Sequence, residues 1–179
     1  MFYNHLGFYG ENLKVAMLEK YIEHEGKTAA FRRAFEEKKG KPWVEQRKAF
    51  AFNGNAIVPA LMETLGLSDD DAQSWFKDKS AVEFSIAQLV EDIKEYVNSK
   101  PGNFRLLFMV DEAGQYVGTD TDMLLNLQSL TEKIGSECGS KVWVICTGQE
   151  AIDEIIKVRA DEFSRIQARF KTRLTLTSS

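Results

Sequence analysis

Five consecutive apolar residues run directly into two carboxylates in the segment Leu106-Leu107-Phe108-Met109-Val110-Asp111-Glu112. An uninterrupted apolar run of this length favours a parallel strand that is buried on both faces. Ligands of open α/β sheets bind at the carboxyl ends of the strands. The segment therefore predicts an α/β sheet that carries acidic side chains at its ligand-binding edge.

Residues 101–179 alternate between strand and helix patterns around this segment. Strands are expected over 104–110, 141–146 and 173–177, and helices over 121–138 and 149–170. Strands that alternate with helices form a parallel sheet with right-handed crossover connections. The predicted fold class is therefore α/β, with a small, incomplete parallel sheet in the second part of the chain.

Residues 1–100 have a helical pattern instead, and the change falls at Lys100-Pro101-Gly102-Asn103. Helices are expected over 12–25 and 28–39, each ended by a glycine. The apolar face of the first is expected to contain Leu13, Ala16, Met17 and Tyr21. Further helix signals are Pro42 at a first helical position, an apolar piece over 57–65, the capping residue Ser68, and a Ser80–Glu83 capping box before a long helix.

The composition sets broad limits on function. The chain has 179 residues, a net charge of −4 and 44% hydrophobic residues, which suits one domain or one and a half and excludes a disordered tail. It contains no apolar run of roughly 18 residues, and Met1 to His5 lack the layout of a signal peptide. Cys138 and Cys146 are expected to be reduced thiols. A cytoplasmic protein without a membrane segment is therefore expected.

The two carboxylates after the first strand, Asp111 and Glu112, match the Walker B pattern of P-loop ATPases. In that pattern the aspartate holds Mg²⁺, usually through water, and the glutamate polarises the attacking water. Hard cations such as Mg²⁺ prefer oxygen ligands, which carboxylates supply. The alternative is an acidic turn without function, and the motif by itself leaves both interpretations open.

Polar residues also follow the second predicted strand, at Thr147 and Gln149. A polar side chain there can contact the γ-phosphate or orient water, as sensor-1 residues do in AAA+ ATPases. Thr147 is also placed to cap the helix that follows. The two roles are compatible with each other.

Arg165 and Arg169 precede the third predicted strand. On a helix they project away from the apolar face formed by Phe163, Ile166 and Phe170. They occupy the place where AAA+ proteins carry an arginine finger, which stabilises charge in the transition state of a neighbouring subunit. The alternative is a solvated helix face with a weak Glu162–Arg165 pair.

The string Gly26-Lys27-Thr28 looks like the end of a Walker A motif but does not fit it. The motif requires a glycine five residues before Gly26, where Tyr21 stands, and a strand where the pattern is helical. We interpret the string as a helix-ending glycine followed by a capping threonine. If Asp111 and Glu112 are a Walker B pair, the sequence is expected to contain the second half of an ATPase core without its phosphate loop.

Several longer strings together resemble one family: Phe108-Met109-Val110-Asp111-Glu112-Ala113-Gly114-Gln115-Tyr116, Asn126-Leu127-Gln128, Val142-Trp143-Val144-Ile145 with Thr147 and Gln149, and 163–174. They resemble the P-loop ATPase of BREX phage-defence systems (BrxC/PglY-like), over most of residues 104–179. The resemblance implies an AAA+-like NTPase in bacterial antiviral defence, much longer than this chain, that binds ATP and Mg²⁺. It further implies self-association and other defence-system proteins as partners. Residues 1–100 would be a helical insertion ahead of Walker B, and 101–179 the second half of the ATPase core. Without a Walker A motif, the chain alone is expected to be inactive.

Competing functions follow from other features of the sequence. Lys27 to Lys48 carries eight basic and three acidic residues with interleaved aromatic residues, which suggests either a DNA contact or a solvated helical face. The main alternative to the ATPase is a non-enzymatic interaction module with a helical docking surface. A metal-dependent nuclease is disfavoured because no Glu-x-Lys follows on a neighbouring strand.

Overall fold

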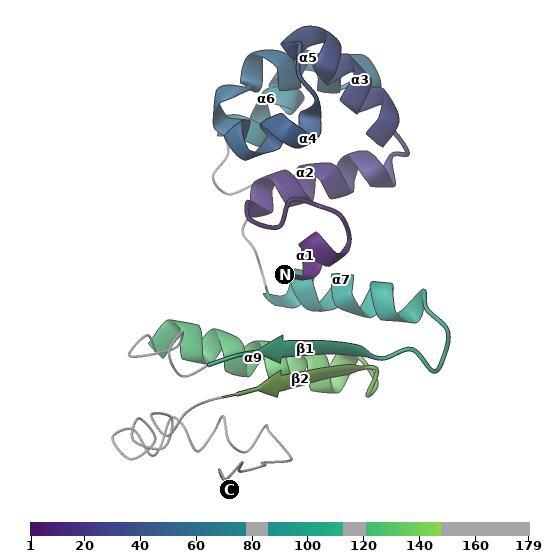
Figure 1. Ribbon diagram of the computed structural model, residues 1–179, viewed down its shortest axis with the longest axis vertical. Coiled ribbons are helices and arrows are strands. Elements are labelled where there is room, and N and C mark those ends of the chain that lie inside the picture. The colour runs from purple at the N-terminus through teal and green to yellow at the C-terminus, as the bar shows by residue number, and fades with distance from the viewer. Residues whose placement is uncertain (78–85, 113–120, 148–179) are drawn as a thin grey trace, which may run out of the picture. The chain divides into compact units, whose positions relative to one another are not determined.

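The computed structural model describes residues 1–77, 86–112 and 121–147 (Figure 1). The chain divides into two compact units, Met1–Phe84 and Ser85–Ser179. The described part of the first unit is helical, and that of the second combines helices with two parallel strands. The protein is therefore a mixed structure of helix and strand, mostly helical, with a small parallel sheet.

The first unit is a succession of short helices joined by tight turns. They are α1 (Phe2–His5), α2 (Leu13–His24), α3 (Thr28–Lys39), α4 (Trp43–Gln46), the 3₁₀ helix η1 (Arg47–Phe52), α5 (Gly54–Leu65) and α6 (Asp69–Lys77). Helix α2 begins at Asn12, whose side-chain oxygen accepts hydrogen bonds from the backbone N–H groups of Lys14 and Val15. Helix α6 begins after Ser68, whose hydroxyl accepts from the N–H of Asp71 at 3.1 Å, which confirms the predicted cap.

Two details of the helical prediction differ from the structure. On α2 the expected face is only partly right: Ala16 is buried, whereas Leu13, Met17 and Tyr21 are half-buried. The buried side also contains Val15, Leu18, Glu19 and Ile22, because α2 carries apolar residues on more than one side. Thr28 does not cap α3. It lies inside the helix, and Lys27 precedes it without a side-chain cap. The predicted span of α3 and its end at Gly40, with φ +71°, are confirmed.

An aromatic cluster forms the centre of the first unit. The rings of Phe31 and Phe35 on α3 each lie edge-on to Trp43, at centroid distances of 5.2 and 5.1 Å. All three side chains are buried, together with Leu18 and Ile57 from α2 and α5. Edge-to-face aromatic contacts add specific attraction to the burial of apolar area. The short helices are thus held by their shared aromatic core.

Glu19 is a buried carboxylate at the edge of this core, with 8% of its surface exposed. It accepts hydrogen bonds from the indole N–H of Trp43 at 2.7 Å, the guanidinium of Arg47 at 3.1 Å and the backbone N–H of Tyr9 at 2.6 Å. Burying a charge is unfavourable unless it is paired and hydrogen-bonded. Since the three donors come from three separate segments, Glu19 joins the loop before α2 to α4 and η1.

Glu19→Gln should destabilise the first unit by about 1–3 kcal/mol. The amide oxygen can still accept the hydrogen bond from Trp43. The amide NH₂ group, however, would face the N–H of Tyr9, and two donors cannot bond to each other. Arg47 would also lose the negative charge with which it is paired. The measurement is urea unfolding followed through the Trp43 indole resonance. The control is Glu23→Gln, an exposed position one turn along α2, which should change stability by less than about 0.5 kcal/mol. Equal effects of the two substitutions would contradict this role for Glu19.

The second unit contains α7 (Ile86–Asn98), β1 (Leu106–Val110), α9 (Thr121–Glu137) and β2 (Val142–Cys146). The strands pair in parallel, with Leu106 opposite Val142 and Val110 opposite Cys146, and α9 is part of the connection between them (Figure 1). Helix α7 packs against α9, and its end is linked to the start of β2 by a bond from Lys141 Nζ to Asn98 Oδ1 at 3.1 Å. Helix α7, grouped by sequence pattern with the first hundred residues, thus belongs to the unit that contains the strands.

The expectation that the first strand is buried on both faces is wrong for the described structure, and the second strand is likewise exposed on one face. Burial alternates along β1 and β2, and one face carries four large exposed side chains: Leu107 (49% exposed), Met109 (61%), Trp143 (59%) and Ile145 (42%). The inward side chains, such as Phe108 and Val142, are partly or fully buried. An apolar run predicts the strand, but it does not reveal how many faces have a covering layer.

None of the helices in the described ranges is long and apolar enough to cross a membrane.

Candidate functional site

The carboxyl ends of β1 and β2 lie at the same edge of the sheet because the strands are parallel. Val110 and Cys146 are opposite each other as the last paired residues. The backbone N–H of Thr147 donates to the carbonyl of Val110 at 2.9 Å, so the ladder extends one residue beyond β2. This brings Thr147 beside Asp111 and Glu112, the two residues that follow β1.

The hydroxyl of Thr147 joins both acidic residues. It donates a hydrogen bond to Oδ1 of Asp111 and accepts one from the backbone N–H of Glu112 at 3.0 Å. Asp111 and Thr147 are exposed, and Glu112 is half-buried. Three of the predicted site residues, from two segments far apart in sequence, are therefore in direct contact. We call them the strand-end cluster: Asp111, Glu112 and Thr147.

Glu112 has a backbone φ of +50°, in the left-handed region. This conformation brings Cβ close to the carbonyl oxygen and is rare for residues other than glycine, asparagine and aspartate. Such strain persists only where the surroundings hold it, and it is found more often at functional sites. Here the holding contact is the hydrogen bond from the Glu112 N–H to Thr147.

The variant with glycine at position 112 should be more stable to unfolding than the variant with alanine by about 1 kcal/mol, because glycine adopts positive φ without a steric penalty. Glu112→Gly and Glu112→Ala are compared by urea unfolding, followed through the Trp143 indole resonance in the same unit. Glu95→Gly and Glu95→Ala, at an exposed helical position in α7, serve as the control. There the alanine variant should be the more stable of the two by about 1 kcal/mol. The same order at both positions would show that residue 112 is not strained in solution.

Thr147→Val should destabilise the second unit by about 0.5–1.5 kcal/mol, since it removes the donor to Asp111 and the acceptor for Glu112 N–H without changing the side-chain shape. Thr147→Ser keeps the hydroxyl and serves as the matched control. Amide hydrogen exchange at Glu112 is the direct measurement. It should speed up in the valine variant and stay close to wild type in the serine variant. Unchanged exchange in both would exclude the Thr147 contact.

The strand-end cluster supplies oxygen ligands suited to a water-rich Mg²⁺ site. Mg²⁺ is typically bound by one or two carboxylates, with water and phosphate oxygens completing its shell. Asp111 and Glu112 fit that requirement. Across the described ranges no three His, Cys, Asp or Glu side chains gather as a metal-binding group.

The thiols near the sheet are poorly suited to nucleophilic chemistry. Burial raises the pKa of Cys146, which immediately precedes Thr147. Burial, with a smaller contribution from the Glu137 carboxylate, also raises the pKa of Cys138. Both cysteines are free, as expected. Because the thiolate is the reactive form, a raised pKa makes both thiols weaker nucleophiles near neutral pH.

The other residues that the sequence singled out lie either outside the described residues or in the first unit. Gln149, Arg165 and Arg169 lie outside the described residues. Gly26 has φ +66° at the end of α2, and the N–H of Lys27 bonds to the Ile22 carbonyl at 3.0 Å. The Gly26-Lys27-Thr28 string is therefore a helix end between two helices, which confirms that it is not a phosphate loop.

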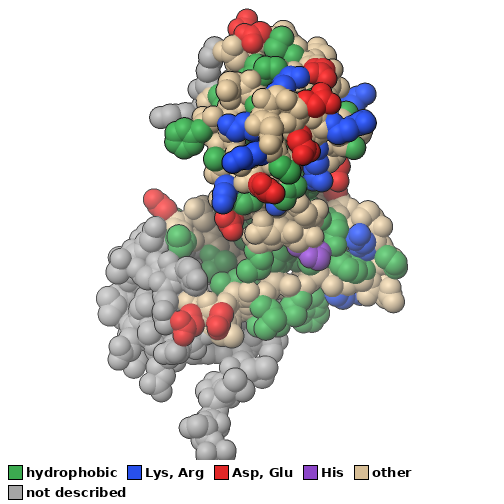
Figure 2. Space-filling model, turned by 45° about the horizontal axis from the view of Figure 1, so that its top comes forward, with side chains coloured by type: hydrophobic (Ala, Val, Ile, Leu, Met, Phe, Trp, Pro, Cys, Tyr) green, Lys and Arg blue, Asp and Glu red, His purple; other side chains and the backbone are tan. Residues whose placement is uncertain are grey.

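The segment from Lys27 to Lys48 has its aromatic residues inside the protein. Phe31, Phe35 and Trp43 are buried in the core, so they present no ring to a nucleic-acid base. Its basic side chains are interspersed with acidic ones, and Figure 2 shows both signs of charge mixed over the first unit. A DNA contact by the basic side chains stays an untested prediction.

Two features of the sites were not predicted from sequence. The first is the positive φ of Glu112, for which the sequence carries no signal because glutamate rarely adopts it. The second is the buried Glu19. Its signal was its position among Val15, Leu18 and Ile22 on one face of α2, where a carboxylate is unusual.

No family model matches this chain, and no solved structure matches it.

Proposed function

We propose that the strand-end cluster is the Walker B and sensor edge of an AAA+-like P-loop ATPase of the BREX phage-defence type. One observation carries the proposal: the Thr147 hydroxyl bonds to Asp111 and to the backbone of Glu112 at the carboxyl edge of two parallel strands. A Walker B carboxylate pair and a sensor residue act on the same nucleotide, so they must lie together. The resemblance of residues 104–179 to the BREX ATPase supports the same conclusion.

In this proposal each member of the cluster has a separate role. Asp111 would hold Mg²⁺ through water, and the ion would supply positive charge to the phosphates of ATP. Glu112 would accept a proton from the attacking water as general base. Thr147 would fix the orientation of the Asp111 carboxylate and of the Glu112 backbone. The exposure of Asp111 and Thr147 leaves this edge accessible to a nucleotide.

The phosphate loop must come from outside residues 1–179, since the sequence has no complete Gly-x-x-x-x-Gly-Lys-Ser/Thr. We therefore propose a longer parent ATPase that binds ATP and Mg²⁺, self-associates and acts with other defence proteins. In that assembly Arg165 or Arg169 would serve as the arginine finger, and Gln149 would accompany Thr147 at the sensor position.

Glu112→Gln in the parent protein should preserve ATP binding and slow hydrolysis by about 10²–10⁴-fold, because only proton acceptance from water is removed. Turnover and nucleotide affinity are measured separately. Glu95→Gln, an exposed change on α7, is the control and should leave both unchanged. Wild-type turnover in the Glu112 variant would remove the Walker B assignment.

The chain by itself should not bind Mg-ATP tightly, because it lacks the cradle of backbone N–H groups that holds the phosphates. Calorimetry with Mg-ATP measures this directly. A micromolar dissociation constant would mean that the nucleotide site is built in another way.

The second candidate, a non-enzymatic interaction module, is favoured by the four exposed apolar side chains on the β1–β2 face. Parallel sheets are normally covered on both faces, so this surface is unusual. The two candidates differ in the Glu112→Gln experiment, because a module that only binds partners has no turnover to lose.

A further inference from the structure

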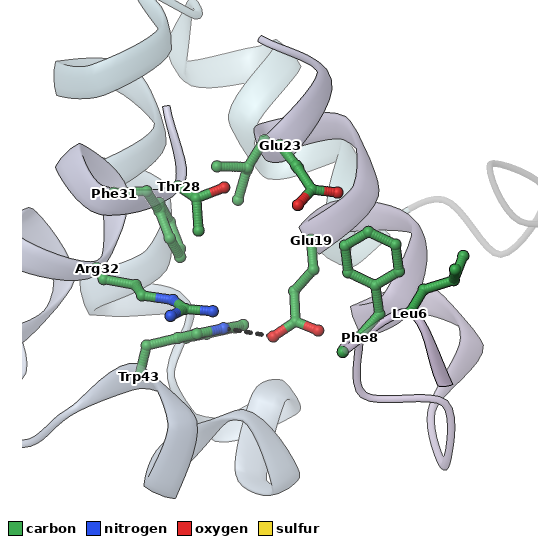
Figure 3. Close-up of a pocket in the computed structure, with 10 residues that line it drawn as sticks. Leu6, Phe8, Glu19, Glu23, Thr28, Phe31, Arg32 and Trp43 are labelled. Atoms are coloured by element: carbon green, nitrogen blue, oxygen red, sulfur yellow. Dashed lines mark hydrogen bonds between the residues drawn. The ribbon is translucent and has the colours of Figure 1, made fainter. Parts of the chain in front are cut away.

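A cavity of about 160 Å³ lies within the first unit, between α2, α3, α4 and the turn after α1 (Figure 3). Its size is close to that of the roughly 150 Å³ cavity that accommodates a benzene ring in a protein core. A ligand of fewer than ten non-hydrogen atoms therefore fits it. The cavity is distinct from the strand-end cluster, which is in the other unit.

One part of the cavity wall is apolar. Ile22, Phe31 and Trp43 contribute to it, and each is no more than 2% exposed. Phe8 completes this wall from the turn after α1, and its side chain is also buried. The exposed fraction of these side chains is small, so this wall can contact a small aliphatic group, which it favours over a polar one.

The remaining wall carries both signs of charge. Figure 3 shows the carboxylates of Glu19 and Glu23 on α2 and the guanidinium of Arg32 on α3 around the same space, with the Thr28 hydroxyl nearby. Glu23 and Arg32 are exposed, and neither forms an ion pair with another described residue. Both are therefore available to a ligand at the mouth of the cavity.

Glu19 also retains capacity for one more donor. An ionised carboxylate has about four acceptor positions, and Tyr9, Trp43 and Arg47 use three of them. Arg47 already balances the charge of Glu19 at 3.1 Å. The charges left for a ligand are one negative, on Glu23, and one positive, on Arg32. A ligand that is overall neutral but carries both charges matches this balance.

We propose that this cavity binds a free α-amino acid with an aliphatic side chain. The ammonium group donates to Glu23 and to the remaining acceptor position of Glu19. The carboxylate accepts from Arg32 and from the Thr28 hydroxyl, in the charge-assisted manner that guanidinium groups favour. The aliphatic side chain packs on Ile22 and Phe31. This proposal does not depend on the ATPase proposal, since it concerns other residues in another unit.

The test uses the full chain and L-leucine as the probe. The protein has three tryptophans, so its ¹H–¹⁵N spectrum contains three indole N–H signals. Trp43 lines the cavity and bonds to Glu19, whereas Trp75 and Trp143 do not line it. L-Leucine should shift the Trp43 signal saturably, with a dissociation constant of about 1 mM or tighter for a ligand of this size. The other two signals should stay in place.

Two analogues separate a zwitterion site from a simpler one. Leucinamide lacks the carboxylate charge, and 4-methylpentanoate lacks the ammonium group. Each should bind at least about tenfold more weakly than leucine, because each loses one set of charge-assisted hydrogen bonds. Equal binding of leucinamide and leucine would overturn the proposal in favour of a cation site. Equal binding of 4-methylpentanoate would overturn it in favour of an anion site.

Matched variants on the same helices or directly next to them complete the test. Arg32→Gln and Glu23→Gln should each weaken leucine binding about tenfold. Arg33→Gln and Glu25→Gln change exposed neighbours outside the cavity wall and should stay within about twofold of wild type. The Trp43 signal of each free variant reports whether the core is intact. The proposal fails if leucine produces no saturable shift in the wild-type chain, or if the cavity variants bind leucine like their controls.

Discussion

The parallel pairing of β1 with β2 is the constraint on which the candidate site depends. In a parallel pair both strands end at one edge, so the residues after Val110 and after Cys146 become neighbours although they are 36 positions apart. The bond from the Thr147 N–H to Val110 extends this ladder and fixes which side chain faces Asp111. A slip of one residue would turn the Thr147 hydroxyl to the opposite face. Register, more than any single contact at the edge, thus creates the cluster.

The sequence predicts the strands and most helices because their signals are local. The apolar runs locate β1 and β2, a serine cap and αL glycines mark helix ends, and the helical spacing of Phe31 and Phe35 identifies the core face of α3. The order of strand and helix then places Asp111 and Thr147 at one edge through the general rule for parallel sheets. The placement of these residues at one edge could be predicted because it needed topology alone and no side-chain detail; their role stays a prediction.

What the sequence could not predict depends on contacts between distant segments. The burial of Glu19 is compensated by Tyr9, Trp43 and Arg47, which come from separate turns and helices. Local periodicity contains no information about those partners, so the face predicted for α2 included Ala16 but missed Glu19 and its apolar neighbours. The exposed face of the sheet could not be predicted for the same reason, since it also depends on contacts with other segments. Periodicity within Leu106–Val110 describes the strand itself, whereas exposure depends on which other elements pack on it.

The backbone of Glu112 helps to decide between a functional edge and an acidic turn. Glycine and asparagine adopt a positive φ at the lowest conformational energy, so they are the residues expected in a simple turn after a strand. Glutamate with a φ of +50° is less favourable there than glycine by about 1–2 kcal/mol, and its side chain does not stabilise the turn itself. In the proposed ATPase the carboxylate of Glu112 would account for the choice of residue, and the Thr147 hydroxyl is a contact that holds the strained backbone in place. A strained acidic residue, fixed by a polar residue from the neighbouring strand end, supports the proposal of a site for cation and water chemistry, because strain of this kind is more frequent at functional sites than in simple turns.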